Sequence, residues 1–360
     1  MDLTTQPVLN IAVTGAGVIG RRHMELIQVN PRTRLCAVVE PTSGSADLAA
    51  SWGVAHFASL EAMFGAPGVA RPDGVILATP NHLHVSGAMT CAQHGVPALI
   101  EKPLAGSLAD GLQLVNALTH SPVPMLVGHH RRHSHTLQLA RRAIASGQLG
   151  RVVTVMGSAQ FYKPDSYFEQ GAWRKELGGG PILINLIHEM DNLRFLCGEI
   201  ESVHATASSA QRHFAVEDTA VMTLRFSSGA LGTFTLSDTV ASPRSWEQTS
   251  GENTAYARYP QEDCYFIAGT QGSMAVPTLR TWSHALGGTE PGWFTPFVEQ
   301  TLPLEAIDPL AAQLDHFCEV IGGHVEPLVT ALDALQSLRT VEAVRQSIAT
   351  GQTVALQDLA

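Results

Sequence analysis

The stretch that decides the fold is Ile11-Ala12-Val13-Thr14-Gly15-Ala16-Gly17-Val18-Ile19-Gly20. An apolar run leads directly into a G-x-G-x-x-G motif, and a segment typical of a helix follows. In this context Gly15 makes the tight turn, Gly17 lets the backbone approach a pyrophosphate, and Gly20 lets helix and strand pack closely. Free N–H groups at the helix start, where Val18 and Ile19 lie, attract phosphates. A glycine turn without a ligand is the alternative, and the order of strand, motif and helix favours dinucleotide binding.

The acidic residue that follows the motif indicates which dinucleotide binds. Glu40 closes the second expected strand, twenty residues after Gly20. A carboxylate at this place accepts hydrogen bonds from the adenosine ribose and repels a 2′-phosphate. No Arg or Lys occurs in residues 41–50 to receive such a phosphate. We therefore expect NAD rather than NADP, unless Arg21 or Arg22 folds back over the adenosine.

The first third of the chain alternates short apolar runs with helix-like segments. Such alternation predicts a doubly wound parallel sheet, and we place this dinucleotide-binding domain at residues 1–128. The expected strands are 8–14, 35–40, 74–78, 98–101 and 125–128, and the expected helices are 20–29, 45–52, 84–94 and 107–118.

After residue 128 the pattern changes to strands without intervening helices, which predicts an α+β domain with a mainly antiparallel sheet over residues 129–360. We expect residues 237–263 and 280–300 to be long loops. The expected helices are 135–145, 181–197, 310–322 and 331–349, and the expected strands are 151–159, 201–208, 220–226, 230–236, 264–268 and 272–277.

Composition limits the classes of partner. The 360 residues carry a formal charge of −10, which argues against nucleic acid and anionic membranes as partners. No run of about 18 apolar residues could span a membrane. The five scattered cysteines and a start without a basic segment before an apolar run favour a cytoplasmic protein.

Three further motifs carry a family resemblance. They are Thr79-Pro80-Asn81-His82-Leu83-His84, Glu101-Lys102-Pro103, and the segment from Gly180 through His188 to Asp191. Together they resemble the Gfo/Idh/MocA oxidoreductases over nearly the whole chain. The resemblance implies a Rossmann domain, a cis Lys–Pro bond, and a second domain whose sheet joins subunits into a homodimer or homotetramer. It also places six residues at the cofactor: Thr79, Pro80, Asn81, His84, Glu101 and Lys102.

The resemblance makes Lys102 a donor to the substrate oxygen and a link in proton transfer, at a strand end where open α/β sheets bind ligands. A surface lysine is the alternative. Glu101 is expected to be its structural partner. We expect His188 to be the general base, because its pKa suits proton transfer near neutral pH. A satisfied core histidine is the alternative.

The helix that carries His188 has a polar stripe, which indicates a lined cavity. Asn185 is expected to orient a substrate hydroxyl, and Asp191 to hydrogen-bond the substrate or His188. Many members of the family carry aspartate four residues before this histidine, where this chain has Ile184. The departure puts a simple transfer of the inositol dehydrogenase mechanism in doubt.

An aromatic loop and several cations suggest the substrate class. We expect Tyr162 and Trp173 to overhang the pocket, and Arg131, Lys163 and Arg174, with Arg244, to make it positive. Arg131 or Arg132 would be a substrate clamp or an interdomain ion pair. This predicts a small, anionic substrate such as a sugar acid, carboxylated polyol or ring diol. A metal at the four histidines of residues 129–135 is disfavoured, because no carboxylate or cysteine joins them.

The sequence thus predicts an NAD-dependent dehydrogenase that acts on a secondary hydroxyl of a small polyol, sugar acid, cyclitol or ring diol. A non-catalytic NAD-binding regulator and an NAD-dependent glycoside hydrolase are the alternatives.

Overall fold

The computed structural model describes residues 7–67, 70–284, 290, 292–305 and 307–359, and these form two compact units. Unit 1 contains residues 1–130 and 310–338, and unit 2 contains residues 131–309 and 339–360. The segment 310–338 lies in unit 1, whereas the sequence analysis assigned it to the second domain. The apolar pattern of a helix shows that it packs on a core, but it does not show on which core.

Unit 1 is built on a six-stranded parallel sheet of order β3-β2-β1-β4-β5-β6. All four residues of β4 and of β5 are buried, as expected for strands covered on both faces. The strands are β1 (Leu9–Thr14), β2 (Thr33–Val39), β3 (Ala55–Phe57), β4 (Gly74–Leu77), β5 (Ala98–Glu101) and β6 (Met125–Gly128). The doubly wound sheet is confirmed. The sequence analysis missed β3, which has three residues and is too short to show a period.

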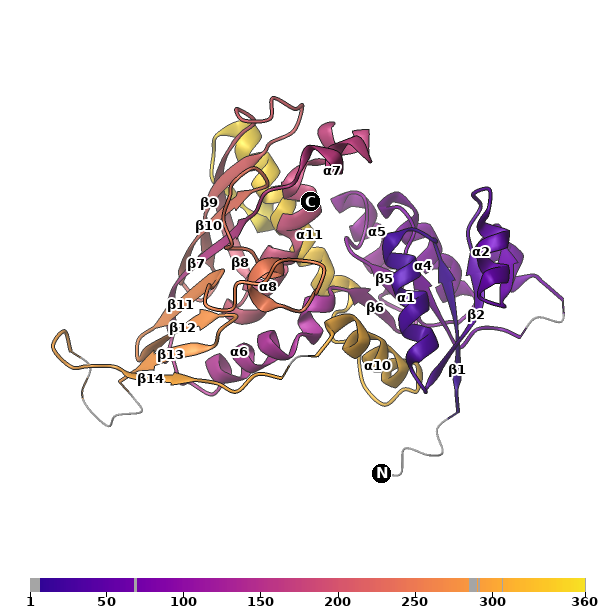
Figure 1. The fold of residues 1–360 in the computed structure, drawn as a ribbon, viewed down its shortest axis with the longest axis horizontal. Coiled ribbons are helices and arrows are strands. Elements are labelled where there is room, and N and C mark those ends of the chain that lie inside the picture. Colours follow the sequence, from indigo (N-terminus) through magenta and orange to yellow (C-terminus); the bar gives the residue numbers. More distant parts are fainter. Residues whose placement is uncertain (1–6, 68–69, 285–289, 291, 306, 360) are drawn as a thin grey trace. The chain divides into compact units, whose positions relative to one another are not determined.

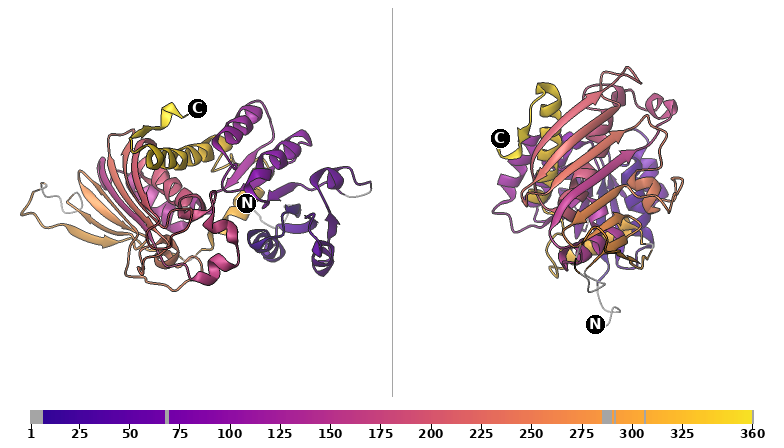
Figure 2. Two further views of the ribbon diagram at one scale, coloured as in Figure 1. Left: turned by 90° about the horizontal axis from the view of Figure 1, so that it is seen from above. Right: turned by 90° about the vertical axis from the view of Figure 1, so that its left-hand side faces the viewer.

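Helices cover both faces of this sheet (Figures 1 and 2). Part of that cover comes from the far end of the chain, because Phe317 and Leu335 are buried in the same apolar core as β1 and β4. The helices are α1 (Val18–Val29), α2 (Ser45–Ser51), α3 (Leu60–Phe64), α4 (His84–Gln93), α5 (Leu108–Leu118), α10 (Pro309–Ile321) and the first part of α11 (Ala331–Thr350).

Unit 2 is built on a nine-stranded sheet of order β14-β13-β12-β11-β7-β10-β9-β8-β15. All its neighbouring strands are antiparallel except β7 and β10, which confirms the mainly antiparallel prediction. The strands are β7 (Val152–Gln160), β8 (Ile200–Ser208), β9 (Thr219–Phe226), β10 (Leu231–Ser237), β11 (Tyr265–Gly269), β12 (Gly272–Val276), β13 (Arg280–Ser283), β14 (Val298–Thr301) and β15 (Val354–Ala355). The two ends of the loop expected over residues 280–300 are therefore strands, because β13 and β14 occupy them.

The helices of unit 2 lie on one face of its sheet (Figure 2). Exposure alternates along β9, where Met222 and Leu224 are buried and Val221 and Thr223 are exposed. No described helix covers the second face. The helices are α6 (His135–Ala145), α7 (Asp165–Glu169), α8 (Ile187–Cys197), α9 (Trp246–Ser250) and the last part of α11. None of the helices in the described residues is long and apolar enough to cross a membrane.

Candidate active site

The glycine motif adopts the geometry that its spacing predicts. Gly15 has a φ of +90°, and a Cβ added there would lie 2.4 Å from the Ala78 carbonyl oxygen. A Cβ on Gly20 would lie 2.0 Å from the Gly15 carbonyl oxygen. Around Gly17, at the start of α1, no described atom lies within 4 Å of an added Cβ. The fold therefore requires glycine at 15 and 20, whereas Gly17 keeps a space open to a ligand.

The surroundings of the motif fit a dinucleotide. The hydroxyl oxygens of Thr14 and Thr79 are buried without a hydrogen-bond partner among the described residues, beside the carboxyl ends of β1 and β4. These two strands are neighbours, and open α/β sheets bind ligands at such ends. Val18 is 94% exposed on the first turn of α1, where a bound molecule would cover it. Polar atoms without partners beside an open helix start indicate a binding site for a polar ligand.

The Glu40 carboxylate is tied to the glycine loop. It accepts hydrogen bonds from the backbone N–H groups of Ala16 at 2.9 Å and Thr42 at 3.1 Å. Burial alone would raise the pKa of Glu40, but these two hydrogen bonds outweigh it and lower the pKa, so the carboxylate stays charged. Arg22 pairs with Glu25 at 3.0 Å, and Arg21 donates to the Ala16 carbonyl oxygen at 3.0 Å. The negative charge of Glu40 favours NAD.

The Glu101-Lys102-Pro103 motif lies at the carboxyl end of β5 with a cis Lys102–Pro103 bond, as the resemblance implied. Glu101 is buried, pairs with His23 Nε2 at 2.8 Å and accepts from the Lys102 N–H at 3.2 Å. Burial would raise the pKa of Glu101, and the His23 contact lowers it below the usual value. Glu101 is thus a structural partner of the Lys102 backbone. The sequence analysis missed His23, although its place three residues after Gly20 on α1 was a usable signal.

His84 connects two of the motifs. Its ring nitrogens lie 2.9 Å from the Thr79 carbonyl oxygen and 2.8 Å from the Pro103 carbonyl oxygen, and the side chain is fully buried. Both ring nitrogens therefore face backbone carbonyl oxygens, and the side chain connects the two motifs. Pro80 and Asn81 are exposed where the short helix Asn81–Leu83 begins, between β4 and α4.

His188 lies in the first turn of α8, and a π-helix over Ile182–Leu186 precedes it. The sequence predicted one regular α-helix over residues 181–197, and a single sequence gives no signal for the wider turn. His188 is 8% exposed. Asn185, in the π-helix, is half-buried.

The other polar residues of this helix have partners inside unit 2. Asp191 is 1% exposed, and both of its carboxylate oxygens accept from Arg132, at 2.7 and 2.8 Å. Buried charges persist when they are paired, and the partner here lies 59 residues earlier in the chain. Asp191 thus forms a buried ion pair with Arg132, and its predicted contact with the substrate or His188 stays a prediction.

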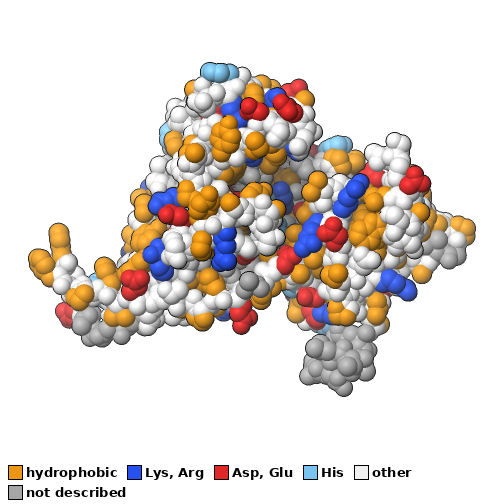
Figure 3. Space-filling model, in the orientation of Figure 1, with side chains coloured by type: hydrophobic (Ala, Val, Ile, Leu, Met, Phe, Trp, Pro, Cys, Tyr) orange, Lys and Arg blue, Asp and Glu red, His pale blue; other side chains and the backbone are white. Residues whose placement is uncertain are grey.

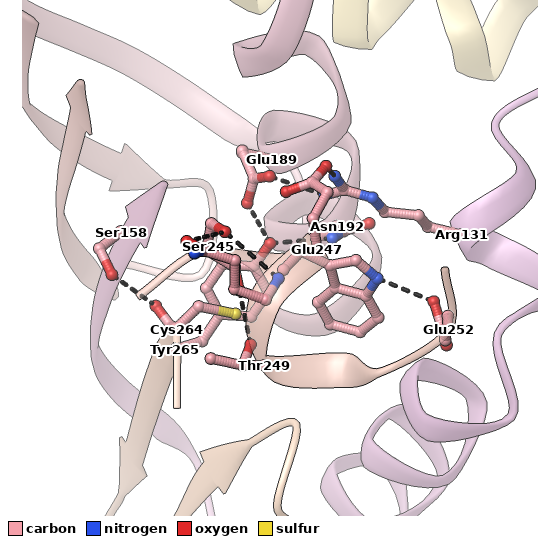
Figure 4. A network of polar contacts seen from close by, with 12 residues as sticks. Arg131, Ser158, Glu189, Asn192, Ser245, Glu247, Thr249, Glu252, Cys264 and Tyr265 are labelled. Carbon is pink, nitrogen blue, oxygen red and sulfur yellow. Dashed lines mark hydrogen bonds and ion pairs between the residues drawn. The ribbon is translucent and has the colours of Figure 1, made fainter. Parts of the chain in front are cut away.

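Arg131 is likewise part of the interior. Its guanidinium donates to Glu189 at 2.7 Å and also pairs with Glu247, and its side chain is 4% exposed (Figure 4). Tyr265 donates to the second oxygen of Glu189 and accepts from Asn192 at 2.9 Å. These contacts attach α8 to β11 and α9. Arg131 is thus neither a substrate clamp nor an interdomain ion pair.

Lys163 has its partners within the candidate site. Its ammonium donates to Asn185 Oδ1 at 2.8 Å, lies 3.6 Å from the Asp238 carboxylate, and is 5.0 Å from the centre of the Tyr167 ring. Burial, reinforced by the nearby charge of Arg212, lowers the pKa of Lys163 to about 8 against the opposing effect of Asp238. A buried amine with this pKa is typical of functional sites. The sequence analysis missed Asp238 and Arg212, which come from distant segments.

Two aromatic side chains of the loop are exposed, and their predicted place over the pocket stays a prediction. Tyr162 is 58% and Trp173 is 55% exposed. Arg174 stacks on Tyr167 at 3.9 Å, and Arg244 pairs with Glu262 at 3.4 Å on the surface. Arg131, Lys163 and Arg244 each have an acidic partner, and these ion pairs reduce the positive charge that the sequence analysis expected in the pocket. On the face drawn in Figure 3, basic and acidic side chains are interspersed.

No three or more His, Cys, Asp or Glu side chains are grouped to hold a metal ion in the part of the chain that the structure describes. Four of the five cysteines are buried, and burial raises the pKa of Cys91 and of Cys197 to about 12. These thiols are inert core residues, as expected.

Two protein-family models match the chain. The model for the oxidoreductase family with an NAD-binding Rossmann fold matches residues 9–129, and the model for the GFO/IDH/MocA C-terminal domain matches residues 137–275. Among curated proteins, the 1,5-anhydro-D-fructose reductase of Ensifer adhaerens is 28% identical over 89% of this chain and 91% of its own. The scyllo-inositol 2-dehydrogenase (NAD⁺) of Bacillus subtilis is 28% identical over 96% of this chain and 95% of its own.

Solved structures share the fold. The WlbA dehydrogenase from Bordetella pertussis, in complex with NADH and UDP-GlcNAcA, superposes with a TM-score of 0.74 at 26% identity and covers 96% of this chain and 98% of its own.

Proposed function

The chain belongs to the GFO/IDH/MocA family of NAD-dependent oxidoreductases, and from this premise we propose that it interconverts a secondary alcohol and a ketone on a small polyol, sugar acid, cyclitol or ring diol. The family match and the full-length relatives, a sugar reductase and a cyclitol dehydrogenase, support this substrate range. The observation that carries the proposal is Lys102 at the carboxyl end of β5, in the same parallel sheet as the glycine loop.

The proposed chemistry divides between two side chains. The glycine loop and Glu40 would hold NAD, which would supply the hydride acceptor for the carbinol carbon. His188 takes the hydroxyl proton, so that the C–H and O–H bonds break and a carbonyl forms. Lys102 donates a hydrogen bond to the same oxygen as its charge develops. In the reverse direction His188 returns the proton.

The test is NADH absorbance at 340 nm with NAD and a panel of polyols, sugar acids and cyclitols. We expect turnover by the wild type, and a loss of about 10²–10⁴-fold in kcat for His188→Gln and for Lys102→Met, with NAD affinity retained in His188→Gln. NAD binding with no turnover of any panel member would instead indicate a regulator, and release of nitrophenol from an aryl glycoside without net NADH would indicate a hydrolase.

We further propose that the uncovered face of the unit 2 sheet joins two copies of the chain. It presents Met156, Val221 and Leu231, each at least half exposed, on the adjacent strands β7, β9 and β10. Apolar side chains grouped on an open sheet face indicate an interface. Sedimentation of the wild type as a dimer or tetramer, and of Met156→Lys as a smaller species, would support this proposal. A monomeric wild type would contradict it.

A further inference from the structure

The contact between Lys163 and Asn185 determines which end of the Asn185 amide is available. Lys163 Nζ lies 2.8 Å from Asn185 Oδ1. Asparagine orientation is ordinarily assigned from its surroundings, because the oxygen and nitrogen look alike. A lysine ammonium has three donors and no acceptor, so the amide oxygen must face Lys163. The NH₂ group of Asn185 then lies at the opposite end of the amide, as a donor.

The position of Lys163 is itself well determined. Its ammonium lies between the Asp238 carboxylate and the rings of Phe161 and Tyr167, and the side chain is 11% exposed. Arg212 donates to Asp238 at 2.9 Å and to the Lys163 carbonyl oxygen at 2.8 Å. These partners come from three separate segments, so the lysine has little freedom to move away from Asn185.

The charges and donors around the pair favour an acceptor group. Lys163 and Arg212, both nearly buried, face the buried Asp238 carboxylate, and the carboxylate of Asp218, also buried, accepts from the Arg212 backbone N–H at 2.9 Å. Lys163 is the member of this cluster that contacts Asn185. Asp165, which lies 3.8 Å from Arg212, is 86% exposed and is screened by solvent. The Lys163 ammonium and the donor-only end of the amide therefore favour an acceptor group, such as a carboxylate or carbonyl oxygen, next to the Asn185 NH₂ group.

We propose that Lys163 and Asn185 form a donor subsite that selects substrates with a carboxylate or carbonyl group near the reacting carbon. The inference rests on the proposed function, because Asn185 precedes His188 by three residues on the same helical segment. A carboxylate in place of this amide would accept a hydrogen bond from a substrate hydroxyl group. The amide held by Lys163 offers the substrate only N–H donors. Lys163 is thus a positioning residue, and Asn185 is the residue that contacts the substrate.

Removal of Lys163 has a specific consequence. Without the ammonium, the amide can rotate by 180° and present its oxygen as well as its nitrogen to the substrate. The subsite can then accept hydrogen bonds as well as donate them. The protonated state of Lys163 at neutral pH, below its pKa of about 8, is consistent with this role.

The test compares matched pairs that differ by a carboxylate against a hydroxymethyl group: D-glucuronate with D-glucose, and D-galacturonate with D-galactose. Each is titrated calorimetrically into the NAD-loaded protein. For at least one pair we expect the acid to bind about tenfold or more tightly, as a charge-assisted hydrogen bond provides. The ratio should fall to about one in Lys163→Met and in Asn185→Leu, and Lys163→Arg should restore part of it. Arg142→Gln, which removes an exposed cation on α6, should leave the ratio unchanged.

Equal affinities within both pairs, failure of both acids to bind, or an acid preference that survives in both Lys163→Met and Asn185→Leu would each overturn the inference. NAD affinity and melting temperature, measured on every variant, show that unit 1 and the fold are intact. Calorimetry measures binding without turnover, so the two proposals can fail separately. If the protein binds acids through Lys163 and Asn185 but forms no NADH, the dehydrogenase proposal is refuted and the subsite proposal stands. If only neutral sugars are turned over, the subsite proposal is refuted and the dehydrogenase proposal stands.

Discussion

The substitution Gly17→Ala should separate cofactor binding from folding. Gly17 is the residue before α1, with φ −70° and ψ −168°, a conformation that alanine adopts without strain. An added Cβ meets no described atom within 4 Å. The folded protein therefore has room for the methyl group, and the space that it occupies is the one through which a pyrophosphate approaches the backbone.

The expected magnitudes follow from this geometry. Alanine is a poorer N-cap than glycine, by less than about 1 kcal/mol, which corresponds to a fall in Tm of about 2–4 °C or less. The methyl group prevents close contact with the phosphates, and we expect NAD to bind at least about tenfold more weakly, or about 1.4 kcal/mol.

Thermal unfolding and fluorescence titration with NADH measure the two quantities on the same sample. Gly20→Ala is the matched control, because its Cβ would lie 2.0 Å from the Gly15 carbonyl oxygen and the backbone must move. That variant should lose about 1–3 kcal/mol of stability as well as cofactor affinity. If Gly17→Ala binds NADH as tightly as the wild type, the glycine loop does not hold the pyrophosphate and the reasoning is refuted.

Other predictions follow from the same structure. Glu40→Ala should weaken NAD binding and reduce the preference for NAD over NADP, because the charge that repels a 2′-phosphate is lost. Titration with both dinucleotides measures the two affinities and their ratio. Arg131→Met should cost about 3–5 kcal/mol in chemical denaturation, because it leaves the buried Glu189 carboxylate without its cation and also removes the cation that pairs with the half-buried Glu247. Glu189→Gln leaves Arg131 paired with Glu247 and should cost clearly less. Equal losses would contradict this asymmetry. Affinity for an acidic substrate should fall as pH rises through about 8, because burial lowers the pKa of Lys163 and its ammonium loses a proton there. If the pH profile of Lys163→Met shows the same inflection, the inflection belongs to another group.

The sequence predicted the cofactor half of the protein well. The order of strand, glycine motif, helix and Glu40 determined a parallel sheet and a dinucleotide site, because turn geometry and the spacing of buried residues act over a few residues. The Glu101-Lys102-Pro103 motif was likewise placed at a strand end, with Glu101 as a structural partner.

The partners of the polar residues were decided only by the tertiary structure. Asp191 and Arg131 looked like substrate contacts, and both pair inside unit 2 with residues 59 and 58 positions away. Asn185 was expected to orient a hydroxyl, and the amide orientation follows from Lys163, which the fold brings to it from another loop. The assignment of residues 310–338 to unit 1 was also decided at this level. Local patterns report whether a side chain is buried, but the partner that satisfies a buried charge depends on which distant segments the whole chain brings within hydrogen-bond distance.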